Sequence, residues 1–343
     1  MNIAKSFIPL ALCALIAVPG NARKPKMQQP TPVEKGLASI NRLTAEAHIG
    51  FLAADQLRGR EASTEEGWIA ANYIQSYLMT LGLKPWNGES YFQPFAAYRA
   101  ERQKRGRYTV HPDSIAKLEQ GVHQRLPMRN VLARIDGKRA DEYVVIGAHF
   151  DHLGVDRMLD GDQIYNGADD NASGVAAVLQ IARAFVEAGV QPERTIIFAL
   201  WDGEEKGLLG SEYFVQSWPD VSQIKGYLNF DMIGRNNQED NPWHVVYFYT
   251  QAHPVFEEWL RNDISTYSFN LKPDYRAWDR PIGGGDNGSF AKREIPIIWY
   301  HTDGHPDYHQ PSDHTDRINW DKTVEITKAA FLNFWNMANE QEY

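Results

Sequence analysis

The sequence predicts an α/β protein in which a mixed, mostly parallel sheet lies between helices. From residue 130 onward, short apolar segments alternate with segments of helical periodicity, which is typical of βαβ units. Acidic and imidazole side chains recur where these strands are predicted to end, and open α/β sheets bind ligands at that edge. A chain of 343 residues with 43% hydrophobic residues can bury the core of one large domain of this class.

The first 32 residues predict a secretory signal peptide and a linker. Lys5 precedes an apolar run at 7–18, and small residues at 20–22 would allow cleavage after Ala22. The apolar run is shorter than the roughly 20 residues of a membrane-spanning helix. Cys13 lies in a loose lipidation pattern, but Leu12 is a poor residue before it. We therefore expect a periplasmic or extracellular protein rather than a lipoprotein, with a linker at 23–32 and a single domain at 33–343.

The N-terminal part of this domain is expected to be helical. Residues 33–57 carry apolar side chains at helical spacing. A helix is predicted from Thr64, as N-cap, to Leu81, because acidic residues occupy its first turn and Gly82 follows it. Residues 92–128 are expected to form an insertion, either a hairpin or a loop.

The βα alternation then continues to the C-terminus. Predicted strands cover 130–135, 143–148, 194–200, 224–230, 245–249 and 295–300, and the continuous apolar run at 194–200 indicates a strand buried on both faces. Predicted helices cover 173–188, 206–215, 254–266 and 321–340.

The charge of the chain limits its partners. The formal net charge is −9, and removal of the signal peptide with its single lysine leaves 34 basic against 44 acidic residues, or −10. Such a balance argues against a nucleic-acid partner, which needs a basic face, and against binding to anionic membranes. We expect no membrane contact beyond export.

Five side chains at or after predicted strand ends indicate a metal site. They are two imidazoles and three carboxylates: His149, Asp169, Glu205, Asp231 and His309. Zinc binds such nitrogen and oxygen ligands in four-coordinate sites, and two zinc ions about 3.5–4 Å apart would share one carboxylate. Taken singly, Asp169 and Asp170 could cap the following helix, and the Glu204–Glu205 pair could be a solvated turn. The occurrence of all five at strand ends favours the metal site.

The order and the residue patterns of these segments resemble those of the M28 family of zinc aminopeptidases. The resemblance begins at Leu57–Glu61 (LRGRE) and extends through residues 130–137 and all the ligand segments to the C-terminus. It implies two Zn²⁺ ions that Asp169 bridges.

The resemblance also assigns the other residues. Asp231 would bind the same ion as His149, and Glu205 the same ion as His309. Glu204 would be the general base, and the carboxylate of Asp151 would orient the His149 imidazole.

The loop Gly283–Phe290 (GGGDNGSF) departs from the family pattern, in which Ser-Asp-His is common. Asp286 matches the aspartate, and the resemblance places it near the α-ammonium group of a substrate. A tyrosine that stabilises the oxyanion in some relatives is missing here, so either Tyr300 or Tyr308 replaces it or zinc alone polarises the carbonyl.

The expected reaction is hydrolysis of the N-terminal bond of a peptide that has a free N-terminus. A carboxypeptidase or dipeptidase would need a basic clamp, for which Arg235 and Arg280 are candidates. A glutaminyl cyclase on the same fold would need only one zinc ion. A non-catalytic binding module would not need Glu204.

Overall fold

The computed structural model describes residues 29–101, 107–278 and 284–343. Residues Thr31–Tyr343 form one compact unit. The predicted signal peptide lies outside the described residues. Within the described part of the chain, no helix is both long enough and apolar enough to cross a membrane.

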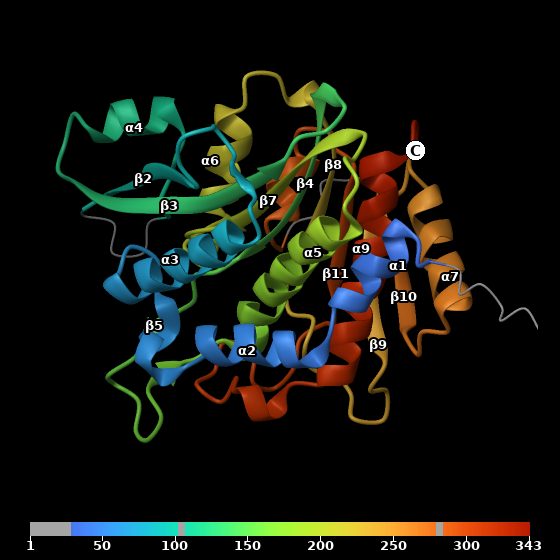
Figure 1. The fold of residues 1–343 in the computed structure, drawn as a ribbon. Helices are drawn as coiled ribbons and strands as arrows, with labels where there is room; N and C mark the ends of the chain where they lie inside the picture. The colour runs from blue at the N-terminus through green and yellow to red at the C-terminus, as the bar shows by residue number, and fades with distance from the viewer. Residues whose placement is uncertain (1–28, 102–106, 279–283) are drawn as a thin grey trace, which may run out of the picture. The chain divides into compact units, whose positions relative to one another are not determined.

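A nine-stranded mixed sheet forms the centre of this unit (Figure 1). Its four middle strands are mutually parallel: β7 (Arg194–Trp201), β4 (Arg139–His149), β8 (Ile224–Phe230) and β11 (Ile297–His301). Beyond β7 lie β3 (His123–Ile135), β1 (Lys84–Pro85) and β2 (Phe92–Ala100), and all their pairings are antiparallel. Beyond β11 lie an antiparallel β9 (His244–Thr250) and then β10 (Lys272–Trp278). Because the middle strands are parallel, their carboxyl ends meet at one edge.

Helices cover both faces of the sheet, which confirms the predicted fold class. The main core lies under α1 (Pro32–Ser39), α2 (Arg42–Leu52), α3 (Glu65–Thr80), α5 (Gly174–Ala188), α7 (Val255–Tyr267) and α9 (Trp320–Asn339) (Figure 1). A second core lies on the other face under α6 (Leu209–Ser217) and α8 (Asn287–Ala291).

Local sequence explains the best-predicted elements. The Thr64 side chain caps α3 by accepting a hydrogen bond from Gly67 N (3.2 Å). The negative charges of Glu65 and Glu66 in the first turn stabilise the helix by interacting with the positive end of its dipole. Every residue of β7 is buried, as its continuous apolar run predicts.

The segment 33–57, which has apolar residues at helical spacing, forms two separate helices. Thr31 caps α1, and Asn41 caps α2 by accepting a hydrogen bond from Thr44 N (3.0 Å). A 3₁₀ segment, η1 (Asp55–Arg60), follows.

The segment 92–128 contains β2, α4 (Pro112–Leu118) and the first part of β3. It packs on α6 through a small apolar cluster that includes Phe95, Met128 and Leu209.

Several short elements were absent from the sequence prediction. Strand β10 is a polar edge strand that contains Pro273, so neither its apolar content nor its periodicity marks it as a strand. The others are α8, the two-stranded β5 (Gly154–Val155) and β6 (Ile164–Tyr165), and the turns η2 (Ala168–Ser173), η3 (Val221–Gln223) and η4 (Thr315–Arg317).

Candidate metal centre

The carboxyl edge of the parallel strands brings together most of the predicted metal ligands. His149 is the last residue of β4, and Asp231 follows β8 directly. Glu205 lies in the loop after β7, and His309 lies in the segment between β11 and η4. Because these strands are parallel neighbours, residues far apart in the sequence meet at one place.

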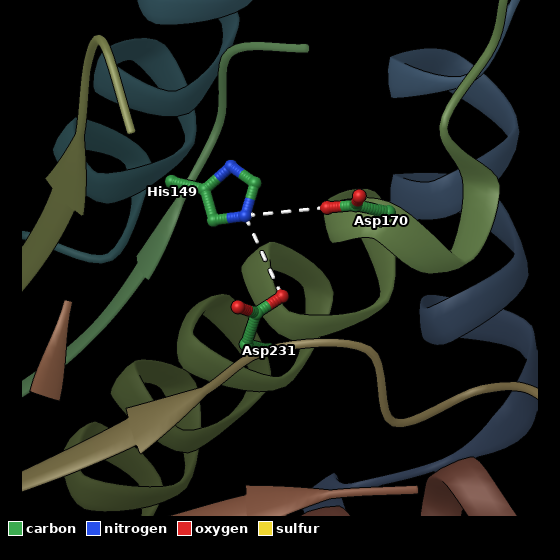
Figure 2. A group of neighbouring side chains, drawn as sticks. All are labelled: His149, Asp170 and Asp231. Atoms are coloured by element: carbon green, nitrogen blue, oxygen red, sulfur yellow. Dashed lines mark ion pairs between the residues drawn. The ribbon is translucent and has the colours of Figure 1, made fainter. Parts of the chain in front are cut away.

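A first group of donor atoms surrounds His149 (Figure 2). The His149 Nε2 atom lies 3.3 Å from Asp170 Oδ1 and 3.5 Å from Asp231 Oδ1. All three residues are buried, and their side chains point toward one another (Figure 2).

A second group of donor atoms surrounds His309. Its Nε2 atom lies 3.2 Å from Asp170 Oδ2 and 3.2 Å from Glu205 Oε2. The two oxygens of Asp170 therefore face different imidazoles, as a carboxylate shared by two metal ions would.

The spacing of these atoms fits zinc. Zn–N and Zn–O bonds of about 2.0–2.1 Å in a tetrahedron place neighbouring ligand atoms about 3.3–3.4 Å apart, close to the 3.2–3.5 Å found in both groups. His152 also lies beside the second group, but its Nδ1 is 2.7 Å from Glu205 Oε1 and 3.9 Å from Asp170 Oδ2. His152, Asp170 and Glu205 also form a group of candidate donors, but the shorter distance is that of a hydrogen bond, which places His152 to support Glu205. His152 is not among the ligands predicted from the sequence, although it follows His149 by three residues.

Asp169 does not occupy the shared position that the sequence analysis assigned to it. Its Oδ1 accepts hydrogen bonds from Gly234 N (2.5 Å) and Ser173 Oγ (3.1 Å), and its Oδ2 faces His305 Nε2 at 3.1 Å. Adjacent residues in the irregular η2 turn direct their side chains oppositely, so Asp170 faces the other ligands and Asp169 faces away. Neither aspartate caps the following helix α5: its N-cap residue is Ser173, and the N–H of its first residue, Gly174, donates to Asn171 Oδ1 at 3.0 Å.

Asp151 supports the site differently from the expected way. The main-chain carbonyl of Asp151, not its carboxylate, accepts the hydrogen bond from His149 Nδ1 (3.1 Å). The carboxylate lies 3.9 Å from that nitrogen and accepts from the main-chain N–H groups of Glu204 (3.0 Å) and Glu205 (3.4 Å). Asp151 therefore holds the glutamate loop in place as well as orienting the imidazole.

The two adjacent glutamates have opposite electrostatic environments. Burial raises the pKa of Glu204 well above its usual range, and the charges of Asp286 and Asp231 add to this rise while His149 opposes it. Burial and the charge of Asp170 also act to raise the pKa of Glu205, but hydrogen bonds from His152 and His309 outweigh them and lower it to about 2. A carboxylate of high pKa suits proton transfer, and one of low pKa suits metal binding.

Asp286 is not at the rim of the site, where the sequence analysis expected it. It is 1% exposed, and its Oδ1 has no hydrogen-bond partner among the described residues. Burial raises the pKa of Asp286 to about 7. Its charge raises the pKa of Glu204, and α8, which starts directly after it, packs against α6.

A cavity of about 220 Å³ opens onto these groups. Its lining combines ligand candidates and Glu204 with mostly uncharged residues. The described lining residues are His149, Asp170, Glu204, Asp231, Met232, Gly284, Trp299, His301, Gly304, Tyr308 and His309. No arginine or lysine occurs among these described residues.

The sequence comparisons place the chain in a known family. The model of peptidase family M28 matches residues 130–333, more than half of the chain and all of the candidate ligands. The chain belongs to this family. Leupeptin-inactivating enzyme 1 of Streptomyces exfoliatus is 34% identical over 170 residues, which cover 49% of this chain and 34% of that protein. The matched regions span 34–39% of the first curated relatives.

The fold is shared with solved structures of other proteins. An aminopeptidase from Aneurinibacillus sp. strain AM-1 superposes with a TM-score of 0.67 at 17% identity, covering 90% of this chain and 97% of that one. The glutaminyl cyclase of Porphyromonas gingivalis also superposes, with a TM-score of 0.62 at 17% identity, covering 86% and 98% of the two chains. The fold alone therefore does not separate the two activities.

Proposed function

We propose that this chain is an aminopeptidase that binds two zinc ions and releases the N-terminal residue of a peptide. The observation that supports this most directly is the pair of donor groups that share Asp170, with Glu204 in the same cavity. His149, Asp170 and Asp231 would hold one ion, and His309, Asp170 and Glu205 the other. Relatives named as zinc metalloproteases and as an aminopeptidase support the choice of metal and reaction.

When bound, zinc supplies a Lewis acid for the scissile carbonyl and lowers the pKa of a bound water toward about 7. Glu204 takes the proton from the attacking water and passes it to the leaving amine. Asp151 keeps Glu204 in position through the hydrogen bond to its main-chain N–H.

Tyr308 is the proposed donor to the oxyanion. It lines the cavity and stacks on His309, with ring centroids 3.9 Å apart, and burial raises the pKa of its phenol so that it stays protonated. Tyr300 is unsuitable, because it is fully buried and donates to Asn333 Oδ1 at 2.8 Å on the far side of the sheet.

The charge of the cavity favours the amino end of a peptide. Its described lining contains no arginine or lysine that could pair with a peptide carboxylate, which favours the amino end over the carboxyl end. A carboxypeptidase would need a free basic side chain instead. Arg235 is buried and paired with Asp307 at 2.6 Å, so it is not available as a clamp. Arg280 lies outside the described residues.

Substrates that differ only at their ends test this proposal. A zinc-loaded protein should cleave a peptide with a free N-terminus, and amidation of the C-terminus should matter little. Acetylation of the N-terminus should abolish cleavage. Loss of activity on C-terminal amidation would indicate a carboxypeptidase, and cyclisation of an N-terminal glutamine without hydrolysis would indicate a glutaminyl cyclase.

We also propose that the chain is exported and cleaved after Ala22, because Lys5 and the apolar run at 7–18 have the order of a signal peptide. N-terminal sequencing of protein recovered outside the cytoplasm should begin at Arg23. Recovery of intact Met1, or of a lipid-modified Cys13, would contradict this.

A further inference from the structure

Arg60, within the LRGRE segment, is completely buried and forms no ion pair among the described residues. Its guanidinium group donates only to main-chain carbonyl oxygens. These are Phe150 O (2.7 Å), Asn166 O (2.5 Å), Leu52 O (3.2 Å), Gly167 O (2.8 Å) and Asp170 O (3.1 Å). The five bonds match the five N–H donors of a guanidinium.

Two of these carbonyls belong to the loops that carry the first donor group. Phe150 directly follows His149, and Asp170 is the shared carboxylate residue itself. We propose that Arg60 is a positioning residue for the metal centre: its guanidinium group ties the loop after His149 to the loop that carries Asp170, and so sets the separation of these two ligands. This inference rests on the proposed metal centre.

Asp313 holds the same loop from the opposite side. Its carboxylate accepts hydrogen bonds from Asp169 N (3.0 Å) and Asp170 N (3.0 Å), and its main-chain carbonyl accepts from Ala168 N (3.0 Å). The carbonyl groups of the loop are thus bound by Arg60 and its N–H groups by Asp313. A loop held on both sides keeps the Asp170 carboxylate between the two imidazoles without the help of a regular helix or strand.

The conformation of the LRGRE segment explains how Arg60 reaches this position. Gly59 has φ +69°, and a Cβ atom there would lie 2.3 Å from Gly154 O and 2.6 Å from Tyr165 O. Only glycine allows the β5–β6 pair to approach so closely. Glu61 then pairs with Lys206 at 2.7 Å, which ties the same segment to the glutamate loop.

A guanidinium group is needed because the carbonyls surround it in several directions. Burial lowers the pKa of Arg60, and the charges of Asp170, Asp313, Asp151 and Glu205 act in the opposite direction. A lysine would keep the charge, but its ammonium is a compact point with three donors and cannot reach both loops.

The test compares Arg60→Lys with Arg194→Lys. Arg194 serves as the control because it is also buried and donates to the main-chain carbonyls of Met337, Glu340 and Gln341, but at the end of β7 away from the metal centre. Unlike Arg60, it also pairs with a carboxylate, that of Glu142, at 2.8 Å. Zinc dissociation constants would be measured by competition with a chromophoric chelator. The visible spectrum of the Co²⁺-loaded proteins would report the geometry of the ligands. Thermal unfolding of the metal-free proteins reports their folding.

We expect Arg60→Lys to weaken zinc binding roughly 10- to 100-fold, as changes to groups that orient ligands do, and to alter the Co²⁺ spectrum. Arg194→Lys should lower the unfolding temperature but leave zinc affinity and the spectrum unchanged. A folded Arg60→Lys protein with wild-type zinc affinity and spectrum would overturn the proposal.

If Arg60→Lys does not fold, Asp313→Asn gives the second measurement, since it loosens the same loop through Asp169 N and Asp170 N. Unchanged zinc affinity in folded Asp313→Asn would also overturn the proposal. These readouts do not depend on peptidase activity. A wild-type protein that binds zinc without cleaving peptides would refute the proposed function but not the role of Arg60, whereas one that binds no zinc would refute both.

Discussion

Exchanging Asp170 for asparagine should remove at least one of the two proposed zinc ions, whereas the same exchange at Asp169 should leave both. Each oxygen of Asp170 faces a different imidazole, His149 at 3.3 Å and His309 at 3.2 Å. An asparagine keeps one oxygen, and its amide nitrogen offers no lone pair to a metal. One ion therefore loses a ligand, which should weaken its binding by more than the roughly 100-fold seen when a supporting group is lost.

The expected effect at Asp169 is on stability alone. Asparagine can keep the oxygen that accepts from Gly234 N and Ser173 Oγ and replaces only the oxygen that faces His305. Hydrogen bonds to a charged acceptor contribute about 1.5–3 kcal/mol and those to a neutral one about 0.5–1.5 kcal/mol. Weakening two such bonds should lower the free energy of unfolding by about 2 kcal/mol.

The assay is elemental analysis after dialysis against a buffer of fixed free zinc, together with denaturant unfolding of the metal-free proteins. Wild-type protein and Asp169→Asn should hold close to two zinc ions per chain, and Asp170→Asn one or fewer. If Asp169→Asn lost zinc and Asp170→Asn kept both ions, the original assignment from sequence would be correct and the structural one wrong.

Three further outcomes follow from the same geometry. Glu204→Gln should keep both zinc ions and lower kcat by about 10²–10⁴-fold, whereas Glu205→Gln should weaken zinc binding; the reverse pattern would mean that base and ligand have been exchanged. Burial acts to lower the pKa of His309, but hydrogen bonds to Asp170 and Glu205 raise it to about 10. The metal-free imidazole is therefore protonated at pH 7.5. Because zinc binds the neutral form, it must displace that proton. Zinc affinity should therefore rise with pH below 10. Calorimetry in buffers of different ionisation enthalpy should detect a proton released when zinc binds to the wild-type protein, and this proton release should be missing in His309→Ala. Tyr308→Phe should lower kcat by about 10²–10³-fold, as loss of one oxyanion donor does, and an unchanged kcat would exclude Tyr308 from this role.

The sequence alone determined the fold class and indicated which loops carry the candidate metal ligands. The buried strand β7 and the capped helix α3 are specified by residues that are close together in the sequence. Both elements can therefore be predicted without knowledge of the tertiary structure. The polar edge strand β10 was missed because an edge strand needs little burial and carries no such pattern.

The tertiary structure decided which atoms face the site. Two adjacent aspartates are equivalent in the sequence, and only the course of the η2 turn, held by Arg60 and Asp313, directs Asp170 inward and Asp169 away. The same applies to Asp151, whose carbonyl and carboxylate serve different partners. In helices and strands the direction of a side chain follows from a fixed period, but in an irregular loop it is set by distant contacts. For that reason the sequence could identify the loops that carry the ligands, but not which of two neighbouring residues is the ligand.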